Sequence, residues 1–372
     1  MKFYKKINNL INNLDFKNIN FNIINKNSKK IYELKNKLYD IWNDSEINNL
    51  NFELLDNEKN EEIKNIFNNS IFNKYSFINN LINKNFKIFN FQLNNINFYY
   101  FDINNNINND IKKIIFMFNI TYTLNKYFNQ NNNNILIIWL PVKKNRDFNY
   151  NIINNENLKN CENNFEAFTC SGVTFGNNPR ITIITRYEEV EKLLVHEIIH
   201  NIGLDGSFYH NKFIDLINDF KLLKGNNYDY KYSIYESYTE LLSTYFMILF
   251  NNIKIYNKKE FINKVRNQII LELIYSYNVI INLIKINNLE LNKNSSDIIY
   301  EGNICFYEYY YLKGLMYNNY ILEFGNDEKS FYDIYINILN MLKKIKINDD
   351  NLLLEINKKY FKNNNFKYTI SN

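Results

Sequence analysis

The sequence predicts an α+β fold, in which a twisted mixed sheet with a backing helix is followed by a helical region. Short apolar and aromatic runs that are typical of strands gather between about residues 85 and 190. A stretch of helical periodicity separates them at 109–128, and helical periodicity dominates from about residue 228 onward. Hydrophobic residues make up 46% and aromatic residues 17% of the 372 residues, which excludes a disordered chain.

The first predicted elements are helices and a hairpin. Residues 1–82 place apolar side chains at roughly helical spacing, as at Ile31, Leu34 and Leu38, and predict a helical N-terminal region. After it, KIFNFQ and INFYYFDI alternate aromatic and polar positions on either side of an Asn-Asn turn. This pattern predicts a β-hairpin over about 87–102.

A helix and three strands are predicted next. The helix over 109–128 begins beside Asn109 and Asp110, either of which is a good N-terminal cap. The continuous apolar run ILIIWL stops at Pro141, which is typical of a buried strand. The three strands are predicted at 135–140 (ILIIWL), 171–175 (SGVTF) and 180–185 (RITIIT).

The segment RYEEVEKLLVHEIIHNIG predicts a helix with one apolar stripe. We expect Arg186, Glu188 and Glu189 to begin this helix, because acidic side chains favour a helix N-terminus, and Gly203 to end it. The stripe consists of Val190, Leu193, Leu194, Ile198 and Ile202. Further helices are predicted at YKYSIYESYTELLSTYFMILF, near 259–287, near 303–318 and near 329–345.

The distribution of charge and the number of cysteines indicate which partners and which cellular compartment to expect. The net charge of +5 is spread along the chain without a basic run, so it does not indicate a nucleic-acid or membrane partner. We expect no signal peptide and no membrane span, because no apolar stretch is long enough for either. Cys161, Cys170 and Cys305 are odd in number and lack zinc-knuckle spacing. They predict free thiols in a reducing, intracellular compartment.

The motif His196-Glu197-Ile-Ile-His200 is the strongest functional signal. On a helix, residues i and i+4 share a face, so the two imidazoles can bind one Zn²⁺ while Glu197 lies beside its open position. Zinc lowers the pKa of bound water, and the glutamate can then act as general base. With three histidines in the chain, a random HExxH is expected roughly once per thousand such chains.

The stretch HEIIHNIGLDGS resembles the active-site helix and turn of the zincin metallopeptidases, and it is closest to the matrixin pattern HExxHxxGLDHS. Gly206 stands where matrixins have their third zinc-binding histidine, and no methionine turn follows. Residues 135–245 also resemble HExxH proteins of large DNA viruses with AT-rich genomes, which implies a viral metallopeptidase in the host cytoplasm or virion. The matching positions are His196, Glu197, His200, Gly203, Leu204, Asp205 and Ser207.

A catalytic zinc needs a third protein ligand, and several candidates remain. His210 is a strong ligand type ten residues after His200, and Asp205 lies one residue from the matrixin position. The helix YESYTE resembles the Glu-x-x-x-Asp/Glu pattern of gluzincins, which implies that Glu236 binds zinc and Glu240 orients a zinc-binding histidine. A second alignment, of TELLSTYF with the same helix, implies that Glu240 is the ligand. We favour Glu236.

The resemblance also implies a zincin-like fold and a peptide substrate. The expected organisation is a helical N-terminal region at 1–82 and a zincin-like catalytic region at 83–372. The catalytic region divides into the sheet with its active-site helix (83–206) and a helical subdomain (207–372). In zincins, the strand before the active-site helix is an exposed edge that pairs with the substrate backbone, a part that RITIIT or SGVTF could play. Candidates for oxyanion stabilisation are Tyr209, Tyr235, Tyr238 and Tyr307.

The sequence thus predicts a zinc-dependent hydrolase, most simply a metallopeptidase that cleaves an extended peptide or protein substrate with Glu197 as general base. One alternative is a catalytically inactive, zincin-like binding or structural module, which zinc analysis would distinguish. Another is a metal hydrolase that acts on something other than peptides. The sequence does not determine the oligomeric state.

Overall fold

The computed structural model describes residues 22–43, 50–74, 76–84, 86–103, 105–128, 134–143, 172–176, 179–206, 209, 234–286, 313, 316, 324–325 and 327–344. The chain divides into two compact units. One comprises Lys37–Gly203, and the other combines Met1–Asn36 with Leu204–Asn372. Helices and a mixed sheet are both present among the described residues, which confirms the predicted α+β class.

The unit Lys37–Gly203 is built around a sheet whose described strands number six, in the order β1-β2-β3-β4-β6-β5. β1, β2 and β3 are antiparallel neighbours, β3, β4 and β6 run parallel, and β5 pairs antiparallel with β6. The strands are β1 (Asn51–Leu54), β2 (Lys87–Leu93), β3 (Ile96–Asp102), β4 (Ile135–Trp139), β5 (Gly172–Phe175) and β6 (Arg180–Ile184).

The predicted hairpin and the three predicted later strands are confirmed as β2 to β6. Asn94, in the turn between β2 and β3, has a φ of 53°, a left-handed conformation that asparagine tolerates better than most residues. β1 was not predicted, because it lies within 1–82, where the pattern indicated helices. All four of its residues are exposed, so burial leaves no alternating signature in its sequence.

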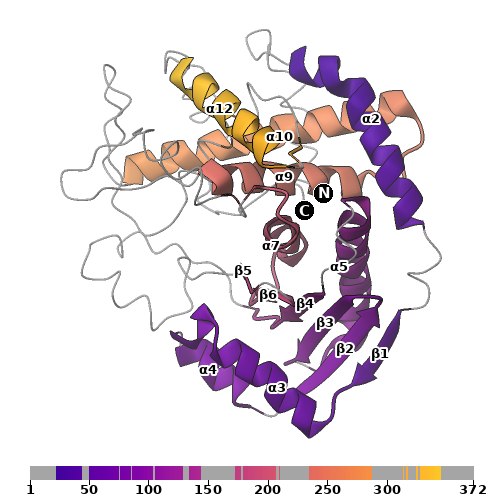
Figure 1. Cartoon of the computed structure of the whole chain (residues 1–372), viewed down its shortest axis with the longest axis vertical. Helices are drawn as coiled ribbons and strands as arrows, with labels where there is room; N and C mark the ends of the chain where they lie inside the picture. Colours follow the sequence, from indigo (N-terminus) through magenta and orange to yellow (C-terminus); the bar gives the residue numbers. More distant parts are fainter. Residues whose placement is uncertain are drawn as a thin grey trace. The chain divides into compact units, whose positions relative to one another are not determined.

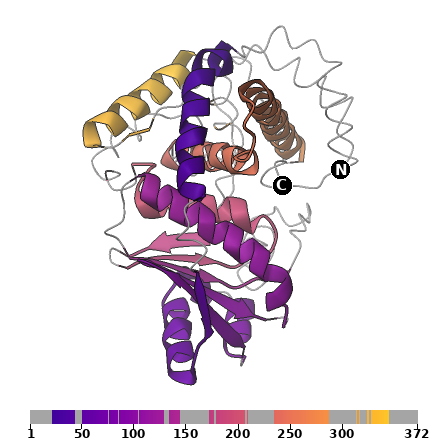
Figure 2. The same ribbon diagram turned by 90° about the vertical axis from the view of Figure 1, so that its right-hand side faces the viewer.

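Helices cover both faces of this sheet (Figures 1 and 2). α3 (Asn57–Asn68) and α4 (Ser76–Ile82), with a short 3₁₀ turn at Ile71–Lys74, pack on one face. α5 (Ile107–Tyr127) and α7 (Val190–Ile202) lie on the other, where α7 contacts β5, β6 and α5. The buried core on the α3–α4 face is formed by Leu55, Ile63, Phe67, Phe72, Ile78, Ile82, Ile88, Phe101, Ile138, Leu140, Val142 and Ile183.

The start of α5 differs from the prediction that Asn109 or Asp110 caps it. The helix begins earlier, with Asn106 at the cap position and no hydrogen bond from its side chain to the helix backbone. Asp110 is instead buried inside the first turn, where its carboxylate accepts hydrogen bonds from Tyr100 at 2.7 Å and from Tyr187 at 2.9 Å. A tertiary contact has therefore replaced the capping role that the sequence indicated.

The other unit is helical in its described residues. The first part of α2 (Asn22–Trp42) belongs to it, together with α9 (Ile234–Asn251), α10 (Lys258–Ile286) and α12 (Glu328–Lys344). These helices confirm three of the four helices predicted after residue 228. Only Lys313 and Met316 of the predicted helix near 303–318 are among the described residues, and both are helical and buried.

Contacts between distant parts of the sequence hold this unit together. The Tyr32 hydroxyl donates to the backbone carbonyl of Tyr256 at 2.6 Å, and the Lys35 ammonium lies over the rings of Tyr32, Tyr256 and Phe261. These contacts attach α2 to the segment that joins α9 and α10. Within the described part of the chain, none of the helices combines the length and the apolar character that crossing a bilayer requires.

Candidate metal centre

The helix α7 carries the HExxH motif and ends as predicted. Gly203 follows it in a left-handed conformation, with a φ of 69°, and its backbone N–H donates to the carbonyl of His200 at 3.1 Å. Glycine adopts this conformation without strain, which explains the stop. The helix begins later than predicted: Arg186 and Glu188 precede it, and Glu189, with a φ of 55°, occupies the cap position.

His196 and His200 meet on one side of α7. Their Nε2 atoms are 3.2 Å apart, and their rings are 4.8 Å apart between centroids. Two imidazole nitrogens that bind one tetrahedral zinc at its usual bond lengths are separated by roughly 3.3 Å. His196 is buried and His200 is half-buried, so both nitrogens are partly shielded from water. The donor atoms and their spacing therefore fit a shared zinc ion.

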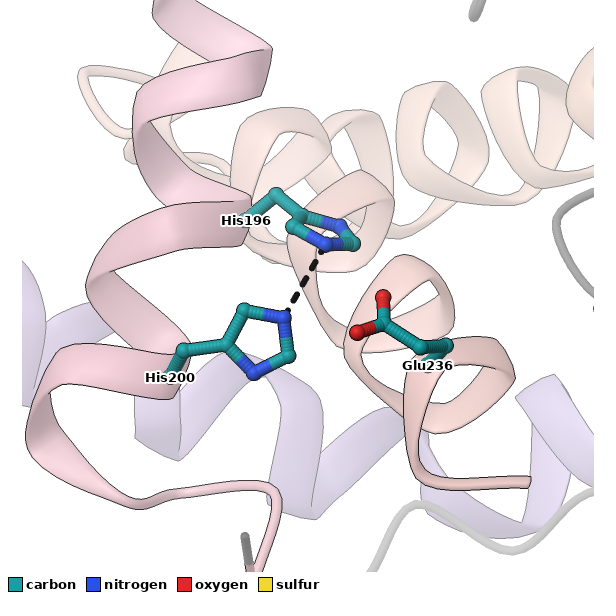
Figure 3. Close-up of side chains that lie close together, drawn as sticks. All are labelled: His196, His200 and Glu236. Carbon is teal, nitrogen blue, oxygen red and sulfur yellow. Dashed lines mark hydrogen bonds between the residues drawn. The ribbon is translucent and has the colours of Figure 1, made fainter. Parts of the chain in front are cut away.

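A carboxylate completes a group that can hold a metal ion. His196, His200 and Glu236 each offer one ligand atom, and these atoms all lie within 4.8 Å of one another. Figure 3 shows the two rings of α7 turned toward each other and the Glu236 carboxylate of α9 facing them. Glu236 is half-buried. The group contains the ligand favoured from the sequence, but the identity of the metal and the role of Glu236 as a ligand stay predictions.

Glu197 points away from solvent and toward the sheet. Only 5% of the residue is exposed, and its Oε2 accepts a hydrogen bond from the Thr174 hydroxyl at 2.9 Å. Thr174 lies on β5, so the strand at the edge of the described sheet contacts the carboxylate that the motif assigns as general base. Neither Thr174 nor any other strand residue was singled out from the sequence, because a threonine in a strand carries no signal of its own.

Glu240, the alternative ligand, has a different partner. Its Oε1 lies 3.2 Å from the Nζ of Lys313, and both side chains are almost completely buried. The lysine ammonium supplies the positive charge that a buried carboxylate needs. Lys313 was not singled out from the sequence, because 73 residues separate it from Glu240.

Asp205 stabilises the turn that follows α7. Asp205 is completely buried, its Oδ2 accepts a hydrogen bond from Thr239 at 3.1 Å, and its carbonyl accepts one from Tyr335 at 2.6 Å. Gly206 has a φ of 76°, and an added Cβ would approach the ring of Phe331 to 2.8 Å. A side chain at position 206, such as the third histidine of matrixins, would therefore be strained and crowded.

Of the remaining residues singled out from the sequence, only Tyr238 and Tyr209 have side chains that the structure describes. Tyr238 is buried against Tyr335, with ring centroids 6.4 Å apart, as expected of a core residue. Tyr209 packs near Phe331. The residues that lie outside the described part, in whole or in their side chains, are His210, Tyr235, Tyr307, Cys161, Cys170 and Cys305.

The sheet order shows which of the two alternative strands lies at an edge. β6 (RITII) lies between β4 and β5 and has a partner on each side, so it is not the exposed edge. β5 (GVTF) is the edge of the described sheet and runs antiparallel to β6. Its four residues are all half-buried.

Comparison with known proteins finds no matching family model, no matching curated protein and no matching solved structure. The site consists of two closely spaced imidazoles on α7, a nearby carboxylate on α9 and a buried glutamate on α7.

Proposed function

We propose that this protein is a zinc-dependent hydrolase, and most simply a zincin-like metallopeptidase. In this proposal His196, His200 and Glu236 bind the zinc, and Glu197 is the general base. The observation that carries it is the 3.2 Å separation of the two histidine Nε2 atoms, within a group whose ligand atoms all lie within 4.8 Å of one another. Two imidazoles and one carboxylate are a usual ligand set of catalytic zinc, which keeps a further position open.

The chain's own residues would carry the proton transfers. Bound zinc supplies Lewis acidity, which lowers the pKa of water and polarises the carbonyl of the scissile bond. Glu197 accepts the proton of the attacking water and delivers it to the leaving amine. Glu197 follows His196 directly on α7, the helix that also carries His200. Its burial limits competition from bulk water for the same proton.

An extended peptide is the substrate class that the sheet supports best. β5 has a strand partner on one side within the described sheet, so backbone groups on its other side can pair with a substrate strand. Thr174 on the same strand contacts the proposed general base. Backbone pairing along β5 would therefore bring a peptide alongside the carboxylate that removes the proton from water.

A cleavage profile tests this proposal. Purified protein, loaded with zinc, is incubated with a diverse peptide library, and products are identified by mass spectrometry. We expect cleavage that stops when a chelator removes the metal and returns when zinc is restored. A chain that binds zinc but cleaves no peptide would contradict the peptidase proposal and favour a non-catalytic module or a hydrolase of another substrate class.

A further inference from the structure

The carboxylate of Glu197 lies against β5, and both of its oxygens have identifiable surroundings. Oε2 is 2.9 Å from the hydroxyl oxygen of Thr174. Oε1 lies beside Gly172, where an added Cβ would stand only 2.7 Å from that oxygen and 2.9 Å from Cγ. Strand β5 thus supplies a hydrogen-bond donor, Thr174, to Oε2. Its Gly172, which lacks a side chain, leaves space for Oε1.

The direction of the Thr174 hydrogen bond can be deduced from its neighbours. A hydroxyl has one proton to donate, and Thr174 has two acceptors of Glu197 within reach, Oε2 at 2.9 Å and the backbone carbonyl at 3.0 Å. Its third neighbour, the Thr182 hydroxyl at 3.1 Å, must then be the donor between the two threonines. Thr174 therefore directs its single proton toward Glu197.

Asn201 fixes the other end of this chain of hydrogen bonds. Its amide nitrogen donates to the Thr182 hydroxyl at 3.1 Å and also lies 3.4 Å from the carbonyl of Arg180. A carbonyl only accepts, so the amide nitrogen faces β6 and the Thr182 hydroxyl is left to donate onward. The bonds run from Asn201 through Thr182 and Thr174 to Glu197, and they begin and end on α7.

We propose that β5 and β6 position the general base: Thr174 holds Oε2 of Glu197, Thr182 and Asn201 orient Thr174, and Gly172 leaves room for Oε1. This inference rests on the proposed function, in which Glu197 is the base. These contacts fix the orientation of the carboxylate that removes the proton from the attacking water. Thr174 is a positioning residue, because it acts through Glu197.

Steady-state kinetics of four variants test whether Thr174 and Gly172 position Glu197 for catalysis. Thr174→Val keeps the shape of the side chain and removes the hydroxyl, so we expect it to retain zinc and lower kcat by about 10–100-fold, with KM nearly unchanged. Thr174→Ser, which keeps the hydroxyl, should restore most of kcat. Gly172→Ala should lower kcat with zinc retained, because the added methyl group displaces the carboxylate. Thr121→Val is the matched control, since the Thr121 hydroxyl is buried and bonds only to the Met117 carbonyl in its own helix among the contacts described.

Wild-type kcat in Thr174→Val, or a serine variant as slow as the valine variant, would overturn the positioning role. A double-mutant cycle on unfolding, with Thr174→Val and Glu197→Ala, needs no activity. We expect Thr174→Val to destabilise the native chain more than it destabilises the Glu197→Ala variant, in which the backbone carbonyl of residue 197 is the remaining acceptor at that position. Additive effects would overturn the contact itself. Absence of hydrolysis by the zinc-loaded native chain, with a non-additive cycle, would instead overturn the proposed function and leave the contact established.

Discussion

At the scale of single residues, two glutamates one helical turn apart have different partners. Glu236 lies in the group with His196 and His200, whereas Glu240 pairs with the buried ammonium of Lys313. Both residues are acidic and both follow the gluzincin-like pattern, so their spacing alone did not separate their roles. The position of the lysine separates them, because it neutralises one carboxylate.

Replacing each glutamate by alanine should therefore give opposite results. Glu236→Ala removes a proposed ligand and should weaken zinc binding by more than the 10–100-fold typical of an outer partner, with little loss of stability. Glu240→Ala should keep zinc affinity nearer that of the native chain and lower the free energy of unfolding by about 3–5 kcal/mol, because it removes the carboxylate that pairs with the buried Lys313 ammonium. Zinc competition titration and urea unfolding measure the two effects. The reverse pattern of zinc affinities would transfer the ligand role to Glu240.

The proposed general base can be removed without changing its shape. Glu197→Gln should keep the fold and one bound zinc but abolish hydrolysis, because an amide does not accept the proton of water. The amide oxygen can still accept the hydrogen bond from Thr174. Turnover, zinc content and circular dichroism are measured on the same preparation. Undiminished turnover would rule out the mechanism.

At the scale of elements, Asp110 joins α5 to two other segments of its unit. It accepts hydrogen bonds from Tyr100 on β3 and from Tyr187, just before α7. Burial, followed by the hydrogen bond to Asp110, raises the pKa of Tyr100 well above the usual tyrosine value. The protonated hydroxyl is thus the form that the folded state requires.

Tyr100→Phe should destabilise the protein by about 1–3 kcal/mol, because it removes one donor from a buried carboxylate. The raised pKa also predicts a pH dependence. Above about pH 10 the unfolded chain releases the tyrosine proton and the folded chain keeps it, so stability falls as pH rises. The decline should be less steep in Tyr100→Phe. Urea unfolding from pH 8 to 11 measures both effects, and identical slopes in the two proteins would contradict this account of Tyr100.

The sequence predicted the features that depend on neighbouring residues in the chain, and it missed those that depend on tertiary contacts. The stop of α7 at Gly203 and the hairpin turn at Asn94 depend on nearby backbone, and both were predicted. The start of α5 was predicted wrongly, because the side chain of the expected cap, Asp110, accepts hydrogen bonds from two tyrosines outside its own helix. Asparagine is too common in this chain to mark turns and caps by itself.

At the scale of the whole molecule, the sequence predicted the α+β class and the motif but not the order of the strands. Periodicity identifies a strand without naming its neighbours, so β6 could not be distinguished from an edge before the sheet order was known. The same limit applies to the site. HExxH places two histidines on one face of one helix, whereas Thr174, Gly172 and Lys313 reach their partners only through the fold.

Equilibrium dialysis can measure whether His196 and His200 share one zinc ion, as proposed here. Apo protein and its His200→Ala variant are dialysed against the same buffered zinc concentration, and bound zinc per chain is determined by elemental analysis. We predict one zinc per chain for the native protein and a large loss of affinity for the variant, because a single imidazole and a carboxylate do not make a catalytic zinc site. Absence of bound zinc in the native protein, or equal binding by the variant, would contradict the claim.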